Sequence, residues 1–229
     1  VNDTGLEMLG EEDDVGSAFV ATSAIDVVMG DVLDDENLLD VLAGYGGRSR
    51  DFLCGTSDDE CPVIDVTCDG AKPTAVELSY PDEDQCLSPV APHVPISGTI
   101  DFVLDEESSV TLTNYRRGDT EYDGVFLIKS YSNREFSVWT DADGITITTD
   151  LHCKSQEVGT MTINSSTPMT AERKLLNFVL SGGRGEIESA SSGRTYDFEI
   201  GDDLEWGLPR DCACPSTGGF EVSGGFIDE

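Results

Sequence analysis

Hydrophobic and polar residues alternate along the central part of the chain, from Ile96 to Thr149. In the segment Thr99–Leu104, Ile100, Phe102 and Leu104 point one way and the residues between them point the other. Alternation with period two, with β-branched residues and polar turns, is typical of antiparallel strands that bury one face. We therefore expect consecutive strands at Ile96–Leu104, Ser108–Tyr115, Gly124–Tyr131, Glu135–Thr140 and Ile145–Thr149.

The same pattern continues on both sides of this central stretch. The pattern predicts a hairpin before the central stretch, with strands at Val63–Thr67 and Ala75–Tyr80. After the central stretch it predicts strands at Val158–Asn164, Glu186–Ser189, Thr195–Ile200 and Phe220–Ile227, and at Glu172–Ser181 either a strand or a short mixed segment. Ser165–Ala171 and Gly201–Pro209, which carries Trp206, are expected to be loops. A sheet of about ten or more strands does not stay in one flat layer, so we expect it to curl into a half-barrel or to form two layers.

A helical pattern is confined to the N-terminal part of the chain. Apolar residues recur at helical spacing within Val15–Leu33, and a shorter helix is predicted at Asp35–Ala43. We expect this helical hairpin to pack on the sheet. The expected fold class is mainly β (α+β), with a helical segment at 1–50, a cysteine-rich loop and hairpin at 51–95, and an antiparallel β region at 96–229, all in one compact unit.

The chain is strongly acidic. Its 229 residues include 46 acidic and 13 basic ones, and the formal net charge is −33. Nucleic acids and anionic membranes are themselves polyanions, so this charge excludes both as direct partners. Two interpretations remain: an acidic surface that keeps the protein soluble in a salty or divalent-rich medium, where counterions screen the repulsion, or a surface dedicated to cation binding.

Seven cysteines indicate an oxidising compartment. They are Cys54, Cys61, Cys68, Cys86, Cys153, Cys212 and Cys214. Four of them lie in one irregular acidic region, where disulfides replace a missing core. The chain begins at Val1, and no stretch resembles a signal peptide or a membrane-spanning segment. We therefore expect a mature, processed protein that is extracellular, periplasmic or at the cell surface.

The four clustered cysteines allow three pairings. Cys61 precedes the first strand of the predicted hairpin and Cys86 follows its second strand, so a Cys61–Cys86 bond would hold the open end together. Cys54–Cys68 would be the complementary bond. The sequence alone does not choose between the three pairings.

The remaining cysteines leave one thiol unpaired. A disulfide between Cys153 and either Cys212 or Cys214 is the simplest interpretation. The alternatives are a disulfide to another chain and a transition-metal site formed by His152, Cys153 and the two later cysteines, because imidazole and thiolates suit zinc or copper.

One acidic segment resembles part of a calcium-binding loop. In Asp119–Gly124, Asp119, Glu121 and Asp123 stand at alternate positions before a glycine, as in the first half of an EF-hand loop. Strands and not helices are expected on both sides, so a solvated hairpin turn is the alternative. Asp141–Gly144 is explained as an Asp-Gly turn.

Several short motifs resemble a loose group of bacterial secreted or lipoprotein-type envelope proteins. These motifs are Cys61-Pro-Val-Ile-Asp-Val-Thr, the later Cys86 with Ile96-Ser-Gly-Thr-Ile, and Cys214-Pro-Ser-Thr-Gly-Gly-Phe-Glu-Val-Ser-Gly-Gly. The resemblance extends roughly from Cys61 to Glu229. It implies an N-terminal helical region followed by a long antiparallel sheet, and a location in the cell envelope. It implies no activity and no catalytic residues.

The sequence contains no recognisable catalytic motif, such as a nucleophile elbow, a zinc-protease helix or a phosphate-binding loop. With the odd cysteine and the glycine-rich last strand, this favours a non-enzymatic structural subunit of an envelope assembly or filament. Its partners would be further copies of itself or other envelope proteins. The alternatives are a module that binds a lipid-like ligand between sheet and helix, and a calcium-dependent adhesin-like domain. No cofactor is expected, apart from possible calcium.

Overall fold

The computed structural model describes a β-rich molecule. The described residues are 54–56, 61–70, 72–81, 86–87, 94–105, 107–130, 135–153, 156–173, 177–190, 193–207 and 217–227. The helices predicted at Val15–Leu33 and Asp35–Ala43 lie outside these ranges. Within them, all regular structure is β-strand, which confirms that the fold is mainly β.

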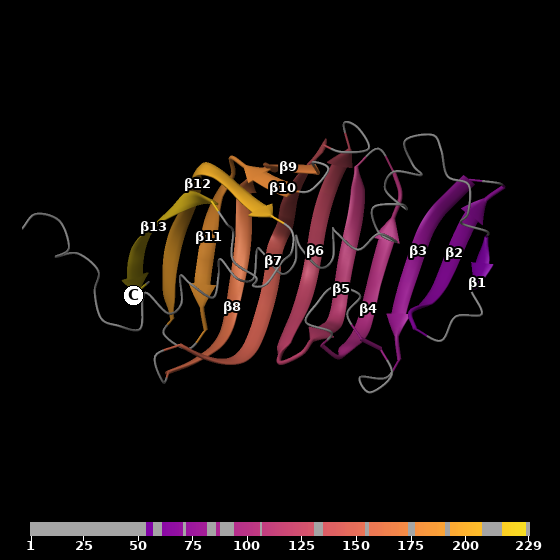
Figure 1. Cartoon of the computed structure of the whole chain (residues 1–229), viewed down its shortest axis with the longest axis horizontal. Coiled ribbons are helices and arrows are strands. Elements are labelled where there is room, and N and C mark those ends of the chain that lie inside the picture. Colours follow the sequence, from indigo (N-terminus) through magenta and orange to yellow (C-terminus); the bar gives the residue numbers. More distant parts are fainter. Residues whose placement is uncertain are drawn as a thin grey trace, which may run out of the picture.

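Within the described residues, thirteen strands form one sheet, in which all pairings are antiparallel. The strands are β1 (Gly55–Thr56), β2 (Val63–Asp69), β3 (Lys72–Tyr80), β4 (Ile96–Val103), β5 (Ser108–Arg117), β6 (Thr120–Ser130), β7 (Glu135–Cys153), β8 (Gln156–Thr167), β9 (Met169–Arg173), β10 (Asn177–Ser181), β11 (Arg184–Ser189), β12 (Arg194–Gly207) and β13 (Thr217–Ile227). Figure 1 shows β1 at one end of the sheet and β13 at the other.

The sheet is an antiparallel meander that follows the order of the sequence. From β1 to β7, each strand pairs with the next one along the chain. The long strand β7 then pairs with β8 through its second half and with β9 through its first half. In the same way, β12 pairs with both β11 and β10. The strands β8 and β9 therefore act as one interrupted strand, as do β10 and β11.

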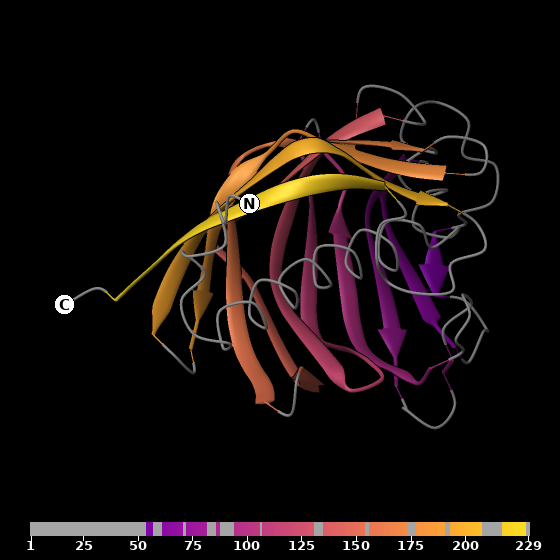
Figure 2. The same cartoon turned by 60° about the vertical axis from the view of Figure 1, so that its left-hand side comes forward.

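These interruptions lie side by side and bend the sheet. Pro168 separates β8 from β9, and Gly182 and Gly183, both with positive φ, separate β10 from β11. In β7 the register against β6 shifts between Phe126 and Gly124, so that Asp141–Gly144 form a bulge. As a result β9, β10 and the end of β12 fold over the rest of the sheet (Figures 1 and 2).

The core lies on one face of the sheet. The strand registers align one cross-strand row from β2 to β13, and its members are Ile64, Leu78, Ile100, Leu112, Gly124, Ile145, Ile163, Ile187, Tyr196 and Gly224. Leu78, Leu112 and Ile187 in this row are at most 2% exposed. Each such side chain contributes about 1.5–3 kcal/mol to stability when it is fully buried, so the alternating pattern holds the sheet together from end to end.

Three predicted boundaries are wrong. Ser165–Ala171 and Gly201–Pro209 are not loops, because β8 and β9 cover most of the first segment and β12 continues to Gly207, including Trp206. Glu135–Thr140 and Ile145–Thr149 belong to one strand, β7. The predicted Asp-Gly turn between them is the bulge, in which Oδ1 of Asp141 accepts hydrogen bonds from the backbone N–H groups of Asp143 and Gly144. Polar residues mark bends here and not the ends of strands.

Candidate functional site: the open edge of the sheet

The predicted calcium segment is a tight hairpin turn with an adjacent bulge. Asp119 is exposed in the turn between β5 and β6, and Glu121 and Asp123 lie on one face of β6. Oδ1 of Asp123 accepts a hydrogen bond of 2.6 Å from the backbone N–H of Asn114, which has a positive φ of 45°. Asp123 therefore caps the bulge in β5 at Asn114, where the register against β6 shifts.

The acidic side chains do not gather around a single point in the described part of the chain. Among these residues, no group of three or more His, Cys, Asp and Glu side chains is arranged to hold a metal ion. The calcium site at Asp119, Glu121 and Asp123 stays a prediction. Nor does any helix of the described ranges have the length and apolar character to cross a membrane.

Two disulfides hold the N-terminal end of the sheet. They join Cys54 to Cys68 and Cys61 to Cys86. Of the three pairings that the sequence allows, this is the one in which Cys61–Cys86 holds the open end of the hairpin. Cys86 is fully buried, and its carbonyl accepts a hydrogen bond from the backbone N–H of Ile96 at the start of β4. The second bond thus ties the connector between β3 and β4 to the hairpin of β2 and β3.

The other predicted cysteine pairing stays open. Strand β7 ends at Cys153, whose register partner is Gln156, next to the pair formed by His152 and Glu157. Cys212 and Cys214 lie outside the described residues. The disulfide and the transition-metal site proposed for these residues both remain predictions.

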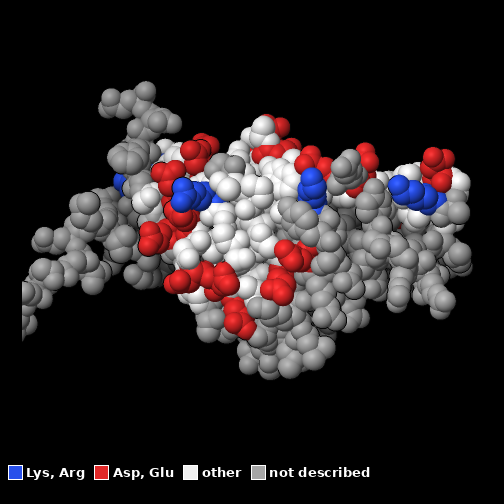
Figure 3. Space-filling view, turned by 90° about the horizontal axis from the view of Figure 1, so that it is seen from above, with Lys and Arg blue, Asp and Glu red and all other residues white. Residues whose placement is uncertain are grey.

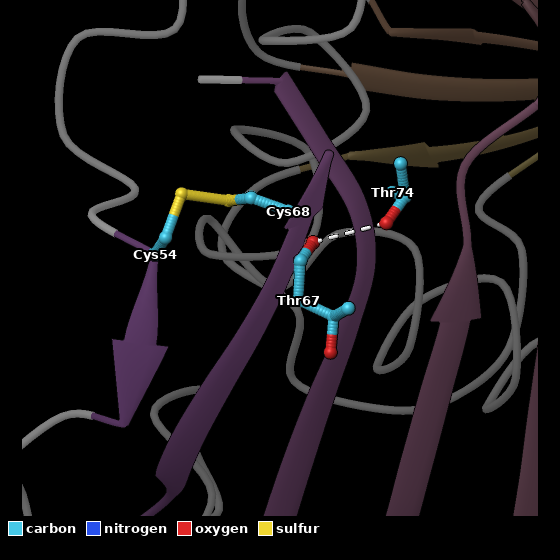
Figure 4. The surroundings of a disulfide bond; sticks show 4 residues. All are labelled: Cys54, Thr67, Cys68 and Thr74. Carbon is cyan, nitrogen blue, oxygen red and sulfur yellow. Dashed lines mark hydrogen bonds between the residues drawn. A yellow bond between two sulfur atoms is a disulfide. The ribbon is translucent and has the colours of Figure 1, made fainter. Parts of the chain in front are cut away.

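The N-terminal edge strand of the sheet is short, and a disulfide ties it to the next strand. Strand β1 has only two residues, Gly55 and Thr56, which pair with Val66 and Asp65 of β2. The Cys54–Cys68 bond ties β1 to β2, and close by Oγ1 of Thr74 donates a hydrogen bond to the carbonyl of Thr67 (Figure 4). Very short edge strands protect a sheet from pairing with other chains, so this edge is blunted.

The C-terminal edge differs in length and composition. Strand β13 has 11 residues and contains one charged side chain, that of Glu221. Its segment Phe220–Gly224 pairs without interruption with Tyr196–Ile200 of β12. Both Glu221 and Ser223 are exposed. Among the described strands, only β12 pairs with β13, so the outer hydrogen-bonding groups of β13 face no strand of the described chain.

Glycine allows β13 to approach β12 closely at its start. Gly218 has a φ of 106°, and a Cβ at this position would collide with the backbone carbonyl oxygen of Asp203. Any other residue at this position would push the start of β13 away from β12. The glycines of this strand are therefore compatible with a well-placed edge strand, although glycine weakens strands in general.

Carboxylates of adjacent strands stand directly opposite one another on the outer face of the sheet. Asp65, Glu77 and Asp101 form one such row across β2, β3 and β4. Further opposed pairs are Glu186 with Asp197, Glu199 with Glu221, and Glu135 with Glu172. Burial raises the pKa of Asp101, and the carboxylate of Glu77 raises it further. Like charges placed directly opposite are unfavourable.

An ion pair offsets part of this repulsion in the described part of the sheet. Nη2 of Arg184 lies 2.7 Å from Oε1 of Glu199, and both side chains are well exposed. Figure 3 shows that acidic side chains dominate the charged surface seen from above, with few basic ones between them. The outer face therefore carries a net negative field, while the C-terminal edge strand is nearly uncharged.

In comparisons with known proteins, no family model, no curated protein and no solved structure matches the chain. The candidate site is therefore defined by physical features alone. The glycine-rich last strand favours assembly already from the sequence, but the difference between the two edges is not visible there, because the two-residue length of β1 has no signal in the hydrophobic pattern.

Proposed function

We propose that this protein is a non-enzymatic structural subunit of an extracytoplasmic assembly at the cell surface or in the cell envelope, and that its copies join through the edge strand β13. One observation carries the proposal: in the described part of the chain, the edge strand β1 at one end of the sheet has two residues, whereas the edge strand β13 at the other end has 11. An exposed edge strand offers unpaired backbone groups to a further strand, and main-chain hydrogen bonds then give affinity.

The composition of β13 supports the same function. Edge strands that must stay unpaired usually carry lysine, proline or inward-pointing charges. Strand β13 contains neither lysine nor proline, and its one charged residue, Glu221, is exposed. A second copy that pairs with β13 would therefore meet one carboxylate on this strand.

The disulfides and the envelope-type motifs of the sequence support the proposed location. Two disulfides are consistent with an oxidising, extracytoplasmic compartment. The alternative function, a module that binds a lipid-like ligand, depends on the predicted helix at Val15–Leu33, which lies outside the described residues. The adhesin-like alternative depends on the Asp119–Asp123 segment, where Asp123 caps a bulge. Neither has an observation in its favour that equals the open edge.

Size-exclusion chromatography with light scattering tests the proposal on the native, oxidised protein. We expect a mass above that of the 24.6 kDa monomer as concentration rises. Because the net charge of −33 opposes association, the series is repeated at low and at high salt, and we expect the larger mass at high salt. A monomer at every concentration and salt condition would overturn the proposed function.

A further inference from the structure

We infer that the partner of β13 is β13 of a second copy, paired antiparallel about a two-fold axis through Val222, so that two sheets become one. This inference rests on the proposed function and makes it specific. In such an isologous contact, each residue stands opposite the one equally far on the other side of the axis. Val222 is the central residue of Phe220–Gly224, the longest uninterrupted segment in the register of β13 against β12.

The pleat of the sheet limits the possible registers. Residues opposite each other on neighbouring strands point to the same face, so a slip by one residue would place core-facing positions opposite outward-facing ones. Phe220, Val222 and Gly224 pair with Ile200, Phe198 and Tyr196, which are all buried. Only registers centred on a residue therefore keep the two core faces on one side.

Charge and regularity choose among the remaining centres. A two-fold axis at Glu221 would place this carboxylate opposite its own copy, which is unfavourable. An axis at Ser223 would place Phe226 opposite Phe220. Phe226 lies outside the regular segment, because the register of β13 against β12 shifts between Gly224 and Phe226. An axis at Val222 avoids both problems, because it uses the whole regular segment and places Glu221 opposite Ser223.

The same register matches large residues with small ones. Phe220 of one copy stands opposite Gly224 of the other, and Val222 stands opposite Val222. Pairing an aromatic residue with glycine across two strands compensates for the missing side chain of the glycine. The cross-strand row that ends at Gly224 in one copy then continues through Phe220 to the buried Ile200 of the second copy. The sequence of this segment is self-complementary in size, charge and face.

Charge variants at Ser223 test this register. The Ser223→Lys variant places a lysine opposite Glu221 twice per dimer, and Ser223→Glu places a glutamate there twice. From typical cross-strand pair energies, we expect the dissociation constant to fall in the first variant and rise in the second, each by about 2-fold to about 30-fold. Thr148→Lys and Thr148→Glu are the matched controls, because Thr148 is exposed on β7, far from the edge, and the net charge changes equally.

The double variant Glu221→Lys, Ser223→Glu separates this register from other contacts. In the isologous pair it creates two contacts between the introduced lysine and the introduced glutamate, where the native protein pairs Glu221 with the neutral Ser223, so it should bind at least as tightly as the native protein. If the protein associates but the Ser223 variants behave like the Thr148 controls, or the double variant binds as weakly as Ser223→Glu, the inference is overturned and the proposed function stands. If the native protein never associates, both are overturned. Circular dichroism checks that every variant is folded.

Discussion

Glu77 of β3 stands directly opposite Asp101 of β4, and Asp65 of β2 stands on the other side of Glu77. Burial and the neighbouring Glu77 raise the pKa of Asp101 above its ordinary value. Between the ordinary and the raised pKa, the folded state binds more protons than the unfolded state. Stability therefore falls as pH rises through this window and is regained as pH falls below it.

Replacing Asp101 with a neutral isostere tests this relationship. We expect Asp101→Asn to increase the free energy of unfolding at neutral pH by about 0.2–1 kcal/mol, and this gain to shrink as the pH is lowered towards the ordinary pKa of aspartate. Urea unfolding of both proteins across the pH range measures the difference. Asp69→Asn is the control: Asp69 is exposed and pairs with Lys72, so its loss should not stabilise the protein. Equal effects of the two substitutions would contradict the account.

The opposed carboxylates also predict a dependence on salt. The screening length falls from about 8 Å at physiological ionic strength to about 3 Å at 1 M, so added salt should weaken repulsion between opposed pairs such as Glu186 and Asp197. We expect the midpoint of urea unfolding to rise with sodium chloride concentration. The rise should be smaller in a variant with Glu77→Gln and Glu186→Gln. An identical salt response in both proteins would show that these pairs do not limit stability.

The disulfide pairing predicts which peptides remain linked without reductant. Digestion and mass spectrometry should recover Cys54 linked to Cys68, and Cys61 linked to Cys86. Removing the first bond with Cys54→Ser and Cys68→Ser frees a loop with a sequence separation of 14, and the expected loss of stability is about 3 kcal/mol. Peptides that link Cys54 to Cys61 or Cys86 would refute the pairing.

Gly98 in β4 has a role that no larger residue can fill. Its register partner is Tyr80, its φ is 94°, and a Cβ would collide with the backbone at Asn114 and Tyr115. The rings of Tyr80 and Tyr115 lie 6.0 Å apart, centroid to centroid. We expect Gly98→Ala to destabilise the protein by about 2–6 kcal/mol, the sum of backbone strain and overpacking.

A second glycine provides the control for this substitution. Gly193 also has a positive φ, of 63°, but a Cβ there would meet nothing within 4 Å. Gly193→Ala should therefore cost only the strain of the left-handed conformation, about 1–2 kcal/mol. Thermal or urea unfolding compares the two variants. If both lose the same stability, the close approach of β4 and β5 at Gly98 is not a constraint on the fold.

Much of the sheet is predictable from the sequence because its pairings are local. Strands such as Ile96–Leu104 and Ser108–Tyr115 differ from β4 and β5 by one or two residues. In these strands, one buried face produces clear alternation, as at Val110 and Leu112. The hairpin of β2 and β3 also places Cys61 and Cys86 at its open end, which is why the sequence suggested their bond.

The errors have a common physical cause. Polar and glycine residues at Asp141–Gly144, Ser165–Thr167 and Gly201–Asp203 have the pattern of strand ends. Yet β7 and β12 continue through the first and last of these segments, and β8 is followed at once by β9 after Pro168. A sequence pattern reports where a backbone leaves the regular pleat, but not whether it reverses direction there. The calcium site at Asp119, Glu121 and Asp123 is not one of these errors and stays a prediction, although Asp123 also has a structural role as the cap of the bulge at Asn114.

Hydrogen exchange of the β13 amides tests the central claim most directly. Mass spectrometry of the native protein at low and high concentration compares a peptide that covers Thr217–Ile227 with one that covers Val63–Asp69 at the other edge. Strand addition predicts slower exchange in the β13 peptide as the mass rises, because new main-chain hydrogen bonds form there, and no change in the β2 peptide. Unchanged exchange in β13 while the protein associates would show that assembly uses another surface.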